Sequence, residues 1–182
     1  MIDEELISGL RVGDEGCFIA VVDAFKKKVC SLCYSYTDNY DDAEDISQEV
    51  FITLFKNIEG FRMECSLSTY IYKITISRCL DFKRKRSIKG FLNGLFNISR
   101  EQKEDIDLDE KAYIRQCIGR LPEDLKSAVV LYFYIGLSQK EIGEVLGVTT
   151  KTVEGRIYRA KQKLKVEFEK EGFIACSKNG MI

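Results

Sequence analysis

Apolar residues recur three and four positions apart over long stretches of the chain, which is the spacing of one face of an α-helix. The first stretch covers residues 14–35, the second residues 41–60 and the third residues 68–86. Alternation typical of β-strands is scarce, and Pro122 is the only proline. The pattern therefore predicts an all-α protein.

A change of texture separates these helices from a second helical part. Glycine, asparagine and serine become frequent after Ile88, and an acidic run follows at residues 104–110. Further helices are predicted over residues 112–119 and 123–134, with Pro122 where proline commonly opens a helix. We expect two small helical domains, residues 10–88 and residues 111–170, joined by a flexible linker at residues 89–110 and followed by a C-terminal tail at residues 171–182.

Residues 138–160 have the features of a helix-turn-helix. Ser138 and Glu141 form a capping box that starts its first helix, and Gly147 permits the left-handed backbone of a tight turn. A threonine at 149 or 150 caps the second helix, which would enter the major groove of duplex DNA. The residues expected to serve DNA binding are Ser138, Thr149, Thr150, Lys151, Thr152, Glu154, Arg156 and Arg159. An ordinary amphipathic helix pair is the alternative.

Charge is distributed in bands along the 182 residues, of which 45% are apolar and 31% charged. The net charge is −8 over residues 1–60, +7 over 61–103, −4 over 104–114 and +4 over 115–182. Two basic bands beside helical units are typical of proteins that bind nucleic-acid phosphates. The acidic first third is expected to avoid DNA and to contact a basic protein surface instead.

Seven scattered cysteines suit a reducing compartment. Cys30 and Cys33 have metal-ligand or redox spacing, but a structural zinc site needs about four ligands and the chain has no histidine. We therefore favour helix packing for this pair and expect no metal or cofactor. The first residues lack the basic start and apolar run of a signal peptide, and no stretch approaches the ~20 apolar residues of a membrane span. A cytoplasmic location without membrane insertion is expected.

Several segments resemble the extracytoplasmic-function sigma factors of bacterial RNA polymerase, and the likeness covers most of residues 10–167. Residues 41–51, which read DDAEDISQEVF, resemble the central signature of this family. Residues 65–74 and 78–85 resemble its promoter-melting segment, and parts of residues 120–164 resemble its terminal DNA-reading module. The resemblance implies a region 2-like helical bundle and a region 4-like helix-turn-helix domain.

The same resemblance implies the partners of each segment. The helix from Asp41 onward would dock on the clamp of the largest polymerase subunit through Asp42, Glu44, Asp45, Gln48, Glu49 and Phe51. The next segment would bind the flipped-out single strand of the −10 promoter element through Phe61, Ser66, Ser68, Tyr70, Lys73, Ser77, Arg78, Lys83 and Arg84. Aromatic rings stack on unpaired bases and cations hold phosphates, although Tyr72 could equally belong to the core. A cognate anti-sigma factor is also implied.

Some positions depart from the family pattern. Tyr70, Ser77 and Glu154 stand where relatives often carry tryptophan, asparagine and a basic residue. Gly155 lies inside the second helix, where glycine costs about 1 kcal/mol against alanine. The promoter sequence of a relative therefore does not carry over to this chain.

We predict a non-enzymatic sigma factor that binds the RNA polymerase core, recognises the −35 and −10 elements and initiates transcription of a stress- or signal-responsive regulon. A free-standing helix-turn-helix regulator is the alternative, and it would bind an operator without polymerase, usually as a symmetric dimer. An enzyme using Glu44 and Asp45, or Cys30 and Cys33, is disfavoured because carboxylates three or four apart on a helix are usually solvated and no histidine base is present.

Overall fold

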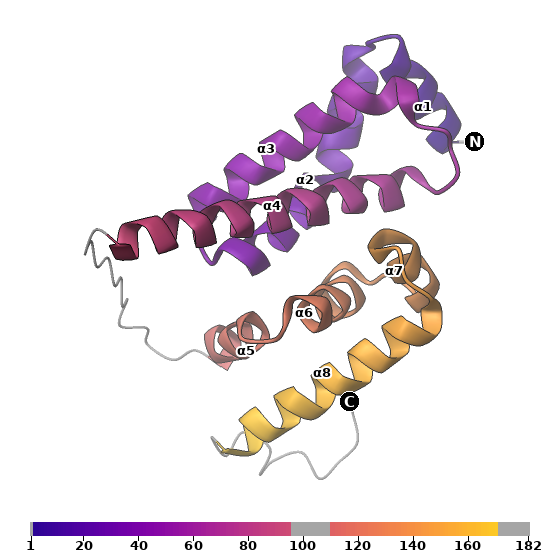
Figure 1. The fold of residues 1–182 in the computed structure, drawn as a ribbon. Coiled ribbons are helices and arrows are strands. Elements are labelled where there is room, and N and C mark those ends of the chain that lie inside the picture. The colour runs from indigo at the N-terminus through magenta and orange to yellow at the C-terminus, as the bar shows by residue number, and fades with distance from the viewer. Residues whose placement is uncertain (1, 96–109, 171–182) are drawn as a thin grey trace. The chain divides into compact units, whose positions relative to one another are not determined.

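The computed structural model describes residues 2–95 and 110–170. They form helices and short connections without any strand, so the all-α prediction is confirmed (Figure 1). The chain divides into two compact units, one built mainly from residues 1–103 and the other mainly from residues 104–182. Each unit has its own buried apolar core.

The first unit contains four helices, α1 (Ile2–Arg11), α2 (Glu15–Thr37), α3 (Tyr40–Asn57) and α4 (Leu67–Leu95). Helices α2, α3 and α4 pack against one another, and α1 packs on α2 and on the 3-10 turn Ile58–Gly60. The fully buried core includes Val21, Val29, Leu32, Val50, Leu54 and Ile71. The sequence did not predict α1, whose Ile7 and Leu10 are buried against this bundle.

Side-chain caps explain where two of these helices begin. The carboxylate of Asp14 accepts a hydrogen bond from the Cys17 amide at 2.7 Å, and the side chain of Asn39 accepts one from the Asp42 amide at 2.9 Å. Such caps satisfy amides that lack a partner in the first turn. The predicted starts of α2 and α3 therefore agree with the structure, whereas α4 continues past Arg86 to Leu95.

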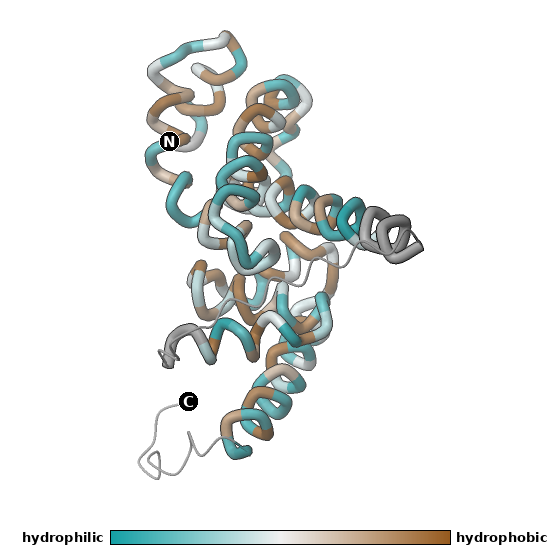
Figure 2. Tube along the Cα trace, turned by 90° about the vertical axis from the view of Figure 1, so that its left-hand side faces the viewer, coloured by the Kyte–Doolittle hydropathy of each residue, from teal (hydrophilic) through white to brown (hydrophobic). Residues whose placement is uncertain are grey.

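The second unit contains α5 (Glu110–Gly119), α6 (Glu123–Val129), α7 (Gln139–Leu146) and α8 (Thr150–Lys170). A wider π-helix, Val130–Ile135, continues α6 and ends at Gly136 with a left-handed φ of 83°. Helix α8 packs against α6 and α5. Hydrophobic and hydrophilic residues both occur along the helices of each unit, as expected of amphipathic helices that pack on one face (Figure 2). No described helix has the length and apolar character to cross a membrane.

Candidate functional site

Local hydrogen bonds stabilise the helix starts of the helix-turn-helix. The Ser138 amide donates to Glu141 Oε2 at 2.8 Å, and the Glu141 amide donates to Ser138 Oγ at 3.3 Å, which is the predicted capping box. Gly147 has the predicted positive φ of 65°. Thr149 caps α8, because the Thr152 amide donates to Thr149 Oγ1 at 3.2 Å. The bonds from Ser138 also lower the pKa of Glu141, which favours the charged carboxylate.

The turn also requires Gly143, which the sequence did not single out. A Cβ atom at this position would lie 2.8 Å from the backbone oxygen of Val148, closer than real Cβ contacts. The Val148 amide donates a hydrogen bond to the Gly143 oxygen at 3.0 Å, which also holds the two backbones close together. A glycine inside a short amphipathic helix that precedes a tight turn was the only available signal.

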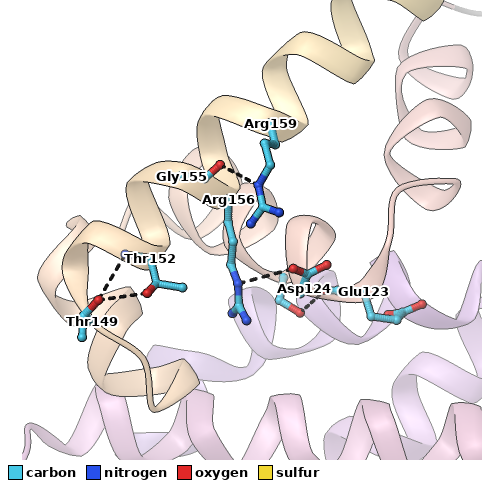
Figure 3. A network of polar contacts seen from close by, with 8 residues as sticks. Glu123, Asp124, Thr149, Thr152, Gly155, Arg156 and Arg159 are labelled. Carbon is cyan, nitrogen blue, oxygen red and sulfur yellow. Dashed lines mark hydrogen bonds and ion pairs between the residues drawn. The ribbon is translucent and has the colours of Figure 1, made fainter.

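Figure 3 shows Thr152, Arg156 and Arg159 along helix α8. Lys151, Thr152, Glu154 and Arg159 are exposed, as expected of residues that meet DNA. The Nε atom of Arg159 donates to the Gly155 oxygen one turn earlier at 3.2 Å. Tyr158 was not predicted, yet its side chain is exposed to 65% on the same helix.

Arg156 differs from its neighbours on α8. Its Nε atom is buried and lies 3.5 Å from Oδ2 of Asp124 on α6, and only 20% of its side chain is exposed. It follows Val153 by three residues and precedes Ala160 by four, and both of those residues are buried. The structure therefore places Arg156 at the edge of the packed face of α8.

Three acidic residues of α3 and one glutamine are exposed close together, and we call this surface the acidic strip: Glu44, Asp45, Gln48 and Glu49. Asp42 is half-buried beside the strip. Asp42, Asp45 and Glu49 line a small groove of about 180 Å³ together with Arg78 and Lys85 of α4. Two carboxylates of the strip therefore lie near cations of the same chain.

Phe51 does not belong to this exposed surface. Its side chain is only 5% exposed and contributes to the core of the first unit. Phe51 follows the buried Val50 and precedes the buried Leu54 by three residues, so its ring faces inward with them. The expectation that Phe51 contacts the polymerase is therefore corrected to a packing role in this structure.

Tyr70 is the most accessible of the three aromatic rings considered for base stacking. Phe61 is 6% exposed and stacks on Tyr70, with ring centroids 4.5 Å apart and an angle of 18° between the rings. Tyr72 is a core residue at 2% exposure, and its ring contacts Phe25. Partial burial raises the pKa of Tyr70, which keeps the phenol protonated. Phe61 therefore supports the Tyr70 ring in this structure and is itself covered.

The segment around Phe61 is held by contacts that the sequence did not reveal. Arg11 at the end of α1 donates from its guanidinium to the Phe61 oxygen at 2.5 Å. Ser66 caps α4, because the Thr69 amide donates to its hydroxyl at 3.1 Å. Ser68 shares a hydrogen bond of 2.9 Å with Ser66. The hydroxyls at 66 and 68 therefore fix the start of α4.

The remaining residues predicted to bind single-stranded DNA lie along α4. Ser77 is exposed, and Lys73 and Lys83 are half-buried. The Nζ atom of Lys73 lies 3.8 Å from the Cys65 sulfur. Arg84 forms an ion pair with Asp81. Arg78 donates to Thr53 Oγ1 on α3 at 2.9 Å, so its guanidinium faces α3.

Burial sets the environment of the Cys30 and Cys33 thiols. Cys33 is fully buried, and a hydrogen bond with the buried Cys79 together with burial raises its pKa strongly. Burial also raises the pKa of Cys30. A raised pKa favours the neutral thiol over the thiolate, which is the reactive and metal-binding form.

Comparison with known proteins accounts for these two units. The family model described as Sigma-70 region 2 matches residues 21–88, and the one described as Sigma-70, region 4 matches residues 111–164. The chain is 31% identical over 179 residues to the ECF RNA polymerase sigma factor SigW of Bacillus subtilis, which covers 91% of this chain and 96% of that protein. The chain belongs to the ECF sigma factors of the sigma-70 family. A free-standing regulator is thereby excluded.

Other relatives agree with this assignment. The sigma factor is 27% identical over 178 residues to the ECF RNA polymerase sigma-E factor of Escherichia coli, which covers 90% of this chain and 93% of the other. A solved structure of CnrH in complex with the cytosolic domain of CnrY has the same fold, with a TM-score of 0.73 and 22% identity over 92% of this chain and 97% of the other. As a sigma factor, the protein associates with RNA polymerase and binds promoter DNA to initiate transcription.

Proposed function

We propose that this sigma factor recognises two promoter elements with separate units, using the residues described above. Helix α8 would read the −35 element as duplex DNA, and the start of α4 with Tyr70 would hold the −10 element as an unpaired strand. The acidic strip on α3 would bind the polymerase core. The observation that carries this proposal is the chemical separation of the surfaces, acidic on α3 and basic with an exposed tyrosine on α8.

We assign core binding to the acidic strip because its carboxylates are exposed and close together. The double variant Glu44→Lys/Glu49→Lys should bind purified core enzyme at least tenfold more weakly, since it replaces attraction to a basic surface with repulsion. Glu59→Lys is the matched control, because Glu59 is exposed just beyond α3 and outside the strip. Equal affinity of the double variant and the control would refute the assignment.

We assign strand binding to Tyr70 because its half-exposed ring is backed on one face by Phe61. An unpaired base would stack on the free face, a contact worth about 1–3 kcal/mol. Holoenzyme with Tyr70→Ala should bind a pre-melted promoter fragment about tenfold more weakly, whereas Tyr70→Phe retains the ring and should bind normally. If both variants bind normally, the ring does not stack on a base.

We assign the duplex element to α8 on the basis of Lys151 and Arg159, whose exposed cations lie on one helix. Runoff transcription with core enzyme and a pool of genomic fragments tests the whole proposal, because it requires both promoter elements. Lys151→Ala/Arg159→Ala should abolish most promoter-dependent transcripts without changing core affinity. Normal transcript yields from the double variant would refute the role of α8.

We further propose that the protein is non-enzymatic, acts in the cytoplasm with the polymerase, and is held inactive by a cognate anti-sigma factor. The solved structure of the sigma factor RpoE with the anti-sigma factor NepR from Bartonella quintana has the same fold, with a TM-score of 0.68 and 20% identity over 84% of this chain and 96% of the other. That complex supports the proposal by analogy of fold. Isolation of the native protein with a partner that inhibits runoff transcription would support it, and native protein that is always free or core-bound would contradict it. We infer that residues 89–110 join the two DNA-reading domains, residues 10–88 and 111–170.

A further inference from the structure

Arg156 is the one basic residue in the first two turns of α8 whose side chain is largely covered. Only 20% of it is exposed, while Lys151 and Arg159 on the same helix are exposed. A base-reading arginine needs an extended side chain whose terminal N–H groups are free to meet a guanine edge. The burial of Arg156 is therefore unusual for a residue that reads DNA.

The covered part of Arg156 faces α6. Its Nε atom lies 3.5 Å from Oδ2 of Asp124, in the first turn of that helix (Figure 3). Asp124 is 32 residues earlier in the chain, so the ion pair links α6 to α8. Among the described residues the buried Nε has no hydrogen-bond partner, and the carboxylate of Asp124 forms an ion pair with it.

An ion pair at this position adds a constraint that apolar packing lacks. Val153, Ile157 and Ala160 bury the inner face of α8, but apolar contacts are non-directional and tolerate small rotations of a helix. The attraction between two charges weakens as they move apart, so the pair favours the rotation of α8 that keeps Arg156 beside Asp124. A rotation of α8 about its axis would move Lys151 and Arg159 relative to a DNA groove.

We propose that Arg156 is a positioning residue: through its ion pair with Asp124 it sets the rotation of α8 on α6, and it does not itself contact DNA. The inference rests on the proposed function of α8 as the helix that reads duplex DNA. Arg156 thus affects promoter recognition through Asp124, and the exposed residues of α8 make the contacts. Asp124, which lies on α6 and not on the helix that carries those exposed residues, becomes a determinant of promoter selectivity.

The test uses the full chain bound to core enzyme and a fluorescent duplex promoter fragment recovered by runoff transcription. Affinity for this fragment and for a scrambled fragment is measured over a range of KCl concentrations, for Arg156→Gln, Asp124→Asn, the double variant and the conservative Arg156→Lys. Thermal unfolding of each variant confirms that the second unit is folded. Asp124→Asn provides an independent route if Arg156→Gln fails to fold.

The expected result is that Arg156→Gln and Asp124→Asn each reduce discrimination between the two fragments by about tenfold, the equivalent of one mismatched base pair. The double variant should be no worse than either single variant, because one interaction is lost in all three. The salt dependence should stay unchanged, and Arg156→Lys should recover part of the discrimination. Removing the negative charge of Asp124 would by itself strengthen DNA binding, so a loss cannot come from simple electrostatics.

Two outcomes overturn the proposal. If Arg156→Gln lowers the salt slope by about one while Asp124→Asn binds as well as the unmodified protein or better, Arg156 is a direct phosphate contact. If both variants lower thermal stability and leave discrimination unchanged, the ion pair is merely structural. Lys151→Ala serves as the control for the proposed function, because it should lower the salt slope by about one. A normal slope for Lys151→Ala would instead show that α8 does not hold the duplex.

Discussion

Replacing glycine by alanine should have opposite effects on stability at two positions of the helix-turn-helix. Replacing a glycine inside a helix by alanine stabilises it by about 1 kcal/mol when the methyl group meets no obstacle. At Gly155 a Cβ atom would have no neighbour within 4 Å, and the residue is exposed on α8. Gly155→Ala should therefore stabilise the second unit by about 1 kcal/mol.

At Gly143 the same methyl group would lie 2.8 Å from the backbone oxygen of Val148. That oxygen cannot rotate away as a flexible side chain would, so the turn must shift by several tenths of an ångström. Overpacking of this kind typically costs about 1–3 kcal/mol. The helix propensity gain offsets about 1 kcal/mol of that, so Gly143→Ala should destabilise the unit by up to about 2 kcal/mol.

Thermal unfolding followed by far-UV circular dichroism measures both variants in the full chain, which contains no tryptophan for fluorescence. A change of 1 kcal/mol shifts the midpoint of a unit of this size by about 4–8 °C. Hydrogen exchange of the α7 and α8 amides assigns each shift to the second unit. If Gly143→Ala raises the midpoint as Gly155→Ala does, the close approach of α7 to the turn is wrong.

Three further changes test other contacts. Hydrogen bonds lower the pKa of Glu141 below its ordinary value of 4.5, so the capping box stabilises the fold above about pH 4.5 and loses this contribution as the pH falls through the folded-state pKa. Glu141→Gln should remove this pH dependence from the free energy of unfolding. An unchanged pH dependence in the variant would contradict the role of Glu141. Leu54→Ala should destabilise the first unit by about 2–5 kcal/mol in urea unfolding, because Leu54 is fully buried. Ile52 is exposed, so Ile52→Ala should change the stability by less than about 0.5 kcal/mol. Similar losses of stability in the two variants would contradict the burial of Leu54 in the core. Arg11→Ala should speed hydrogen exchange of residues 61–66, since it removes the bond to the Phe61 oxygen, and unchanged exchange would argue against a role for α1.

The features that the sequence predicted well depend on neighbours in the chain. The capping box of Ser138 and Glu141 and the left-handed Gly147 are set by residues within a few positions of one another, so their residue types are sufficient. The all-helical fold follows from apolar spacing in the same way, and the two units follow from the change in composition after Ile88.

The features that the sequence missed depend on distant partners. Arg156 has the type and spacing of an outward DNA contact, but its position is decided by Asp124, 32 residues away. Phe61 has the type of a stacking residue and is covered because Tyr70 and the Arg11 contact enclose its segment. A single sequence gives residue types and local spacing, whereas burial of one side chain by another requires the packed structure.

The π-helix between α6 and α7 should allow this part of the molecule to lose one residue without losing its core. Deleting one residue from an α-helix rotates everything beyond it by about 100° and usually brings buried residues to the surface. Here the buried residues Val130 and Ile135 are five apart, and removal of the exposed Phe133 would leave them four apart, on one face of an ordinary α-helix. Relatives that lack one residue at this point can therefore keep the same core, and a gap inside a helix is the expected form of their alignment with this chain.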